Sequence, residues 1–291
     1  MSPSSSDAFR RHWPEYMMEA AGLGFFMLSA CLCTALVAYS GSPVARTIPS
    51  PILQRCLIAV AMGLTAIVII YSPWGRQSGA HINPAVTLTF WRLGKIATPD
   101  ALFYMLAQFV GGTAGVLLSK ALLGRVIADP TVNYAVTVPG PRGMFAALLG
   151  ECVIAFATMT VVLFMTSRPQ LERWTGLVVG LLVALYVAIE SPLSGFGMNP
   201  ARTFSSALPS GIWTAGWIYF VVPPLAMLLA AHFHVTLSQP CHAGCAKMHH
   251  CPLKRCIFCG YRMTESVEPA TDDVALCNAT EPRASKTASV A

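Results

Sequence analysis

The fold is decided by a sequence that occurs twice, Ser78-Gly-Ala-His-Ile-Asn-Pro-Ala85 and Ser194-Gly-Phe-Gly-Met-Asn-Pro-Ala201. The two copies lie 116 residues apart and both end in Asn-Pro-Ala. Proline suits the first position of a helix, because its missing N–H needs no partner there. The preceding asparagine can cap the helix by accepting a hydrogen bond from a backbone N–H with its side-chain oxygen. Each copy therefore predicts a helix that begins directly after its asparagine, with Pro84 or Pro200 in the first turn.

The two helices that begin at these motifs are too short to cross a membrane. They span roughly 84–93 and 200–208, and at 1.5 Å per residue each is about 15 Å long, half of a hydrocarbon core of about 30 Å. Ala85 and Ala201 are small enough to let the two helix starts meet near the centre of the bilayer. The side-chain NH2 groups of Asn83 and Asn199 would then be fixed donors aimed at a passing oxygen atom.

Long apolar segments surround both motifs. The chain is 55% hydrophobic and 11% charged, whereas a soluble domain carries roughly 25% charged residues. Six segments approach or exceed the roughly 20 residues that span a bilayer: Met17–Tyr39, Ile52–Tyr71, Ala101–Leu123, Met144–Thr166, Trp174–Ile189 and Trp213–His234. The sequence predicts an all-α membrane protein with six transmembrane helices and two half-helices.

Residues 17–236 form one domain that divides into two repeats, at about 17–123 and 144–236. An odd number of spans separates equivalent points, so the second repeat is inverted relative to the first. Inverted repeats with broken helices at matching positions indicate a permeation site at the membrane midplane. Residues 1–16 form a polar N-terminus, and residues 237–291 form a tail that is rich in Cys and His and partly disordered.

Six spans place both chain ends on the same side of the membrane. With that side as the cytoplasm, 13 of the 19 Lys and Arg residues lie inside and six lie outside, as the positive-inside rule favours. We therefore expect a multi-pass protein of the cell membrane with both termini cytoplasmic. The net charge of +6 is explained by this topology, and no nucleic-acid partner is expected.

The two motifs, read as Gly79-Ala-His-Ile-Asn-Pro-Ala-Val-Thr-Leu88 and Met198-Asn-Pro-Ala-Arg-Thr-Phe204, resemble the signature loops of the aquaporin (major intrinsic protein) family. The resemblance covers about residues 15–234. It implies a passive channel for water and small neutral solutes such as glycerol, with one pore per chain in a homotetramer. Aquaporin-type pores are an established case of helix dipoles and a fixed arginine that exclude protons and ions. An enzyme is not expected, because the spans contain no Ser/His pair, carboxylate pair or metal-binding cluster.

The resemblance also implies an outer selectivity filter. Arg202 matches the arginine that follows the second motif in the family, and the family spacing indicates Val187 and Phe196 as two further filter residues. The position on the second helix is either Met62 or Gly63, because the segment 72–77 is one residue longer than the family pattern.

The solute remains open at this stage. Val187 stands where water-specific members carry His, and Thr203 stands where glycerol facilitators carry Asp. The chain departs from both patterns, so water with some glycerol-sized solutes is the working hypothesis. The alternatives are a channel for ammonia, hydrogen peroxide, urea or a metalloid acid, and a non-conducting structural membrane protein.

Two acidic residues lie inside predicted spans. A carboxylate in a membrane is often functional, but a buried one also needs hydrogen-bond donors. The resemblance implies that Glu19 and Glu151 support the backbones of the two motif loops rather than transfer protons, and that His81 packs within its loop rather than binding a ligand. Several glycines suit close crossing of membrane helices, namely Gly22, Gly24, Gly111, Gly112, Gly115, Gly176 and Gly180.

The tail holds six of the ten cysteines, interleaved with three histidines. Cys256-Ile-Phe-Cys259 resembles one knuckle of a zinc ribbon, and Cys241 and Cys245 could complete the four ligands that structural zinc requires. Cytoplasmic cysteines are kept reduced, which favours metal or lipid over a disulfide. Palmitoylation and a simple disordered tail are the alternatives. No other cofactor is expected.

Overall fold

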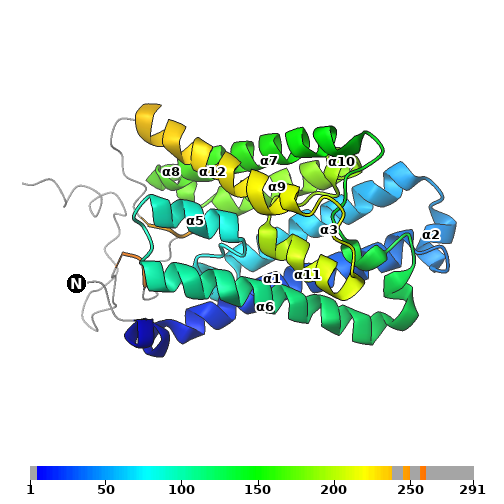
Figure 1. The fold of residues 1–291 in the computed structure, drawn as a ribbon, viewed down its shortest axis with the longest axis horizontal. Coiled ribbons are helices and arrows are strands. Elements are labelled where there is room, and N and C mark those ends of the chain that lie inside the picture. Colours follow the sequence, from blue (N-terminus) through cyan, green and yellow to red (C-terminus); the bar gives the residue numbers. More distant parts are fainter. Residues whose placement is uncertain (1–4, 238–244, 250–255, 260–291) are drawn as a thin grey trace, which may run out of the picture.

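The computed structural model describes residues 5–237, 245–249 and 256–259, and the regular structure of these residues is helical. The long helices run along one bundle (Figure 1): α1 (Ser5–Ala38), α3 (Pro51–Tyr71), α6 (Thr98–Leu123), α7 (Gly143–Thr166), α9 (Thr175–Ile189) and α12 (Trp217–Leu237). Two half-helices lie among them, α5 (Pro84–Arg92) and α11 (Pro200–Ser210). Short helices complete the connections: α2 (Pro43–Thr47), α4 (Pro73–Ser78), η1 (Gly124–Ala128), η2 (Asn133–Ala135), α8 (Pro169–Glu172) and α10 (Ser191–Ser194).

Five of the long helices are long and apolar enough to cross a membrane. The sixth predicted span is α9, whose 15 residues make a helix of about 22 Å. The one-turn helix α10 follows it after Glu190 and extends the chain further in the same region. The predicted spans and half-helices agree with the observed helices to within four residues, except at the start of α1.

Helix α1 begins 12 residues before the predicted span, at Ser5. The predicted polar N-terminus, residues 1–16, is therefore helical from Ser5 onward. Asp100 at the start of α6 fixes this extension, because its Oδ1 accepts a hydrogen bond from the Tyr16 hydroxyl at 2.5 Å and lies 2.8 Å from His12 Nδ1. The hydrophobicity of the sequence reports where the membrane begins, not where the helix begins.

The outer face of the bundle is apolar. On α3 the exposed large side chains include Leu57, Val60, Leu64 and Val68, which recur at the three- and four-residue spacing of one helix face. All six tryptophans of the chain are exposed and lie at or near helix ends, as expected where a membrane meets water: Trp13, Trp74, Trp91, Trp174, Trp213 and Trp217. This surface belongs in lipid.

The helix contacts come in matched pairs, as an inverted repeat requires. Helix α1 packs on α6 as α7 packs on α12, and α1 packs on α3 as α7 packs on α9. The half-helix α11 packs on α6, and its counterpart α5 packs on α12. Helices α3 and α9, which are equivalent to each other, meet across the centre. The two half-helices thus enter the bundle from opposite ends (Figure 1).

Glycines permit the closest of these helix crossings. A Cβ atom on Gly63 of α3 would lie 2.7 Å from the Gly180 carbonyl oxygen of α9, and one on Gly180 would lie 2.8 Å from the Gly63 carbonyl oxygen. The α1–α6 contact is similar, since a Cβ on Gly111 would overlap the carbonyl oxygen of Ala20. Such close backbone approach brings the helices near enough to hold the motif loops between them.

Candidate permeation pathway

The two Asn-Pro-Ala motifs begin α5 and α11 as capped half-helices. Asn83 Oδ1 accepts a hydrogen bond from Ala85 N at 2.8 Å, and Asn199 Oδ1 accepts from Ala201 N at 3.0 Å and from Arg202 N at 3.2 Å. Pro84 and Pro200 are the first residues of their helices. Ala85 and Ala201 are fully buried.

The two motifs are joined by a reciprocal pair of hydrogen bonds. Asn83 Nδ2 donates to the Met198 carbonyl at 2.9 Å, and Asn199 Nδ2 donates to the Ile82 carbonyl at 2.7 Å. An amide NH2 group carries two hydrogens. Each asparagine uses one of them in this pair of hydrogen bonds, which fixes the direction of its second hydrogen. Both asparagines also line an inner cavity, as expected if the second N–H meets a permeating oxygen atom.

The loops before the motifs repeat the same backbone conformations. Gly79, Ala80 and Ile82 have positive φ angles, and so do Gly195, Phe196 and Met198, which stand 116 residues later. A non-glycine residue in this region costs energy and persists only where its surroundings enforce it. Alternating conformations of this kind turn successive N–H groups to one side, where an anion can collect them.

Glu19 of α1 collects the N–H groups of the first loop. Its Oε1 accepts from His81 N at 3.0 Å and from Ser78 Oγ at 2.7 Å, and its Oε2 accepts from Ile82 N at 2.6 Å and from Gln108 Nε2 at 2.9 Å. The carbonyl of each peptide unit points opposite to its N–H. The carbonyls of this loop are therefore turned away from Glu19, toward the inner cavity that Ala80 and His81 line.

Glu151 of α7 has the same place at the second loop. Its Oε1 accepts from Gly197 N at 2.7 Å and from Ser194 Oγ, and its Oε2 accepts from Met198 N at 2.5 Å. A tyrosine also supports the start of each loop in the same way. Tyr104 donates to the Ser78 carbonyl at 2.7 Å, and Tyr219 donates to the Ser194 carbonyl at 2.6 Å. Burial is complete for both glutamates, and both are hydrogen-bonded.

Two cavities inside the bundle share part of their lining. The outer one has a volume of about 190 Å³ and the inner one of about 70 Å³, enough for a few water molecules. Phe26, Phe196 and Arg202 line both, so they form the junction between the two spaces. Val187 lines the outer cavity.

Arg202 lies on the first turn of α11 and is 8% exposed. Its Nη1 donates to the Ala135 carbonyl at 2.7 Å, and η2, which ends at Ala135, is held in left-handed backbone conformations. Within the described residues the buried Nε of Arg202 has no hydrogen-bond partner. A solute at the junction could supply that partner.

The two candidates on α3 have different surroundings. Met62 lines the outer cavity, whereas Gly63 packs against Gly180 and Ala184 of α9. The geometry places Met62 at the pathway and Gly63 at a helix contact. Phe26 was not among the predicted residues. It lies seven residues after Glu19, two turns along the same face of α1, and this periodicity could have indicated it.

The tail contacts the first motif loop. His81 Nε2 lies 2.6 Å from the Ala246 carbonyl, and because a carbonyl only accepts, the ring nitrogen is the donor. Met248 N donates to the Gly79 carbonyl at 3.2 Å, and Lys247 Nζ donates to the Arg76 carbonyl at 3.1 Å. His81 therefore links the half-helix α5, through Thr87 Oγ1 at 3.1 Å from its Nδ1, to the tail.

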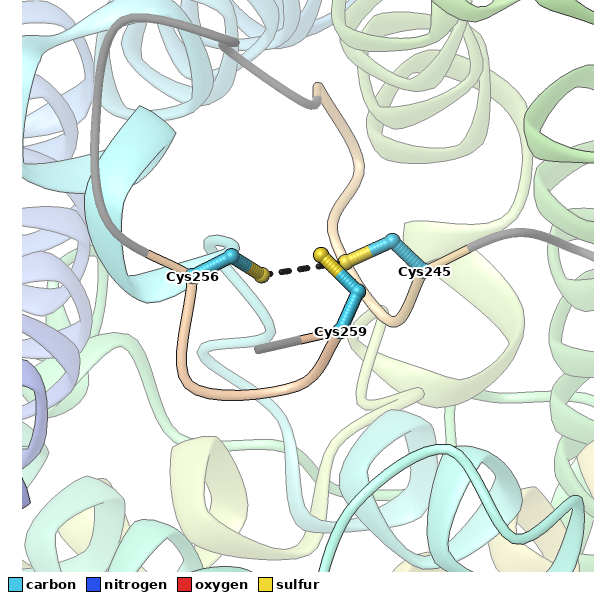
Figure 2. A group of neighbouring side chains, drawn as sticks. All are labelled: Cys245, Cys256 and Cys259. Atoms are coloured by element: carbon cyan, nitrogen blue, oxygen red, sulfur yellow. Dashed lines mark hydrogen bonds between the residues drawn. The ribbon is translucent and has the colours of Figure 1, made fainter. Parts of the chain in front are cut away.

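Three predicted zinc ligands lie together in the described part of the tail (Figure 2). Cys245, Cys256 and Cys259 have their sulfur atoms within 4.8 Å of one another, and the Cys245 and Cys256 sulfurs are 3.3 Å apart. The hydrogen bond to Cys256, together with burial, raises the pKa of the Cys245 thiol. The fourth predicted ligand, Cys241, lies outside the described residues.

Two half-helices that meet head to head inside a six-helix bundle, beside a chain of cavities, define a membrane channel for small solutes. The major intrinsic protein family model matches residues 7–234. This chain belongs to that family, the aquaporins, which are membrane channels and not enzymes.

Individual relatives agree with this assignment. The chain is 34% identical over 232 residues to Aquaporin NIP2-3 of Zea mays, covering 79% of this chain and 72% of that protein. It is 31% identical over 218 residues to Aquaporin NIP1-1 of Arabidopsis thaliana, covering 74% and 71%. The X-ray structure of the aquaglyceroporin from Plasmodium falciparum has the same fold, with a TM-score of 0.64 at 19% identity over 77% of this chain and 95% of that one.

Proposed function

We propose that the chain is a passive channel for water and for uncharged solutes up to about the size of glycerol, and that it excludes protons and ions. The observation that carries this proposal is the pair of cavities that meet at Arg202 beside two opposed helix N-termini. The second cavity contains both motif asparagines, whose amides present donors to a solute.

Ion exclusion follows from the charges along the pathway. The described lining of both cavities includes Arg55 and Arg202 and no carboxylate. Each half-helix also directs the positive end of its dipole at the centre. A cation that left water would meet positive potential with no carboxylate in the described lining to replace its hydration. A neutral molecule would lose only hydrogen bonds that the asparagines and the loop carbonyls can replace.

The proposed filter consists of Met62, Val187, Phe196 and Arg202, with Phe26 beside them. Its walls are apolar except for the guanidinium of Arg202. A narrow passage of this composition suits a molecule with carbon on one side and hydroxyl groups on the other, such as a small polyol. Water is small enough to pass the same site.

A permeability panel tests this proposal. Full-length protein in vesicles, kept in reducing buffer with a chelator, is exposed to gradients of water, glycerol, urea, ammonia and hydrogen peroxide in a stopped-flow instrument. We expect vesicle shrinkage and glycerol entry to be faster than in empty vesicles, with no proton leak. Shrinkage no faster than in empty vesicles, with correctly folded protein, would remove the water channel. Selective flux of one of the other solutes would replace the proposed substrate.

The family implies two further features that we propose for this chain. Four chains would form one assembly with a separate pathway in each, which native mass spectrometry of the purified protein can measure. Both termini would lie in the cytoplasm of a cell whose plasma membrane holds the channel. Protease access to the tail in intact and opened cells tests this orientation.

A further inference from the structure

The described tail segments occupy the mouth of the pathway on the side of the first motif loop. Ala246 and Lys247 are fully buried and Met248 is 4% exposed. Met248 lines the inner cavity together with Asn83 and Asn199. A segment that follows α12 therefore borders the same space as the asparagines at the centre of the channel.

Contacts from both tail segments fasten this arrangement to the loop. His81 and Met248 contribute the two hydrogen bonds given above, and the Phe258 ring stacks on the His81 ring with centroids 5.6 Å apart and an angle of 9° between the planes. Phe258 also meets Tyr104 edge-on at 5.9 Å. Two pieces of tail, residues 245–249 and 256–259, thus converge on one histidine.

The three cysteines lie where these two pieces meet, and their spacing suits a metal ion. Zinc binds thiolate sulfur at about 2.3 Å in a tetrahedron, which sets its sulfur ligands about 3.8 Å apart. The observed separations, 3.3 Å for one pair and at most 4.8 Å for all three, bracket that value. Cys256 and Cys259 also have the two-residue spacing of a zinc knuckle.

The burial of two of the three thiols separates zinc from the alternative modifications at those two positions, while Cys259 is exposed. Cys245 is 8% exposed and Cys256 is 4% exposed, so neither presents a sulfur atom on which a lipid chain could be mounted without first withdrawing the segment. A disulfide would require the Cys245 and Cys256 sulfurs to approach to about 2.05 Å, and would leave Cys259 out. A single ion uses all three.

We propose that Cys245, Cys256 and Cys259 supply three of the four ligands of a zinc ion, and that this ion holds residues 245–249 in the mouth and closes the channel there. The closure rests on the proposed function, whereas the metal site does not. Without the ion, the Cys245–Cys256 hydrogen bond still joins the two tail pieces, but a thiol hydrogen bond is weaker than zinc–thiolate coordination. Loss of zinc would then free the mouth and raise the flux.

Metal content is measured first, on the full-length purified chain loaded with zinc alone. We expect about one zinc per chain, and thiolate-to-metal charge-transfer absorption when cobalt replaces zinc. The Cys256→Ser/Cys259→Ser variant should hold less than about 0.2 zinc per chain, while Cys56→Ser, which alters a half-buried cysteine of α3 far from the tail, should bind like wild type. A zinc content of the wild type below about 0.2 per chain would overturn the proposed zinc site. So would a Cys245–Cys256 disulfide found by mass spectrometry of protein prepared under reducing conditions.

Flux is measured next, on the same preparations in vesicles. We expect zinc-loaded wild type to conduct several-fold more slowly than after chelation, and the double variant to conduct at the chelated rate with or without zinc. Equal flux of wild type in both states would overturn the closure and leave the metal site standing. If zinc binds but neither the chelated chain nor the double variant exceeds empty vesicles, the proposed channel function fails instead.

Discussion

Replacing each buried glutamate by glutamine tests how the motif loops are held. Glu19 and Glu151 occupy equivalent places in the two repeats, and both accept loop N–H groups. They differ in the number of donors, since Glu19 accepts four hydrogen bonds and Glu151 accepts three. Glutamine keeps the size and offers one oxygen and one NH2 group in place of two oxygens.

The expected loss of folding stability depends on how many hydrogen-bond donors lose their acceptor. With Ser78 and Gln108 held as in the wild-type structure, either orientation of the amide in Glu19→Gln leaves two donors unpaired, because each oxygen of Glu19 accepts two bonds. In Glu151→Gln the NH2 group can face Met198 N alone. Each buried donor without a partner costs about 1–3 kcal/mol. The variants should therefore lose about 2–6 and about 1–3 kcal/mol of stability, respectively.

Chemical unfolding in mixed micelles, followed by tryptophan fluorescence, compares both variants with wild type. We also expect the flux per folded chain to fall further for Glu19→Gln than for Glu151→Gln. Equal losses for the two variants, or a larger loss for Glu151→Gln, would refute the assignment of four donors against three.

Three further changes probe other parts of the pathway. Arg202→Val should keep the water flux and let protons pass, because it removes the buried cation at the junction. A pH-sensitive dye inside the vesicles measures the proton leak. Vesicles with this variant that leak no protons would contradict a role of Arg202 in proton exclusion. Gly63→Ala should destabilise the protein by about 1–3 kcal/mol through overpacking, while the lipid-facing Leu64→Ala should not. If Gly63→Ala instead changed the solute preference and left the stability unchanged, Gly63 would be a filter residue. Phe258→Ala should raise flux in zinc-loaded protein by weakening the contact with His81, and flux equal to wild type would argue against that contact.

Much of this fold could be predicted from the sequence because a bilayer leaves few solutions. The apolar segments had to become helices, and the two Asn-Pro-Ala motifs had to begin helices too short to cross. The repeat offset of 116 residues relates not only the motifs but also the strained loop residues, from Gly79 and Gly195 to Ile82 and Met198.

Other features depend on three-dimensional contacts without a local signal. The choice between Met62 and Gly63 could not be made by counting, because it depends on which of the two residues faces α9 and which faces the cavity. The approach of Ala246 to His81 joins residues 165 apart, and no periodicity links them. The start of α1 depends on Asp100 of another helix.

Paired tryptophan substitutions on α9 test the central claim, that solute passes between the two half-helices. Val183 lines the inner cavity with Asn83 and Asn199, whereas Leu181 is 58% exposed on the lipid face. With folded protein in vesicles and a chelator present, Val183→Trp should reduce the flux to that of empty vesicles and Leu181→Trp should leave it as in wild type. Wild-type flux through Val183→Trp would place the pathway elsewhere and contradict the account.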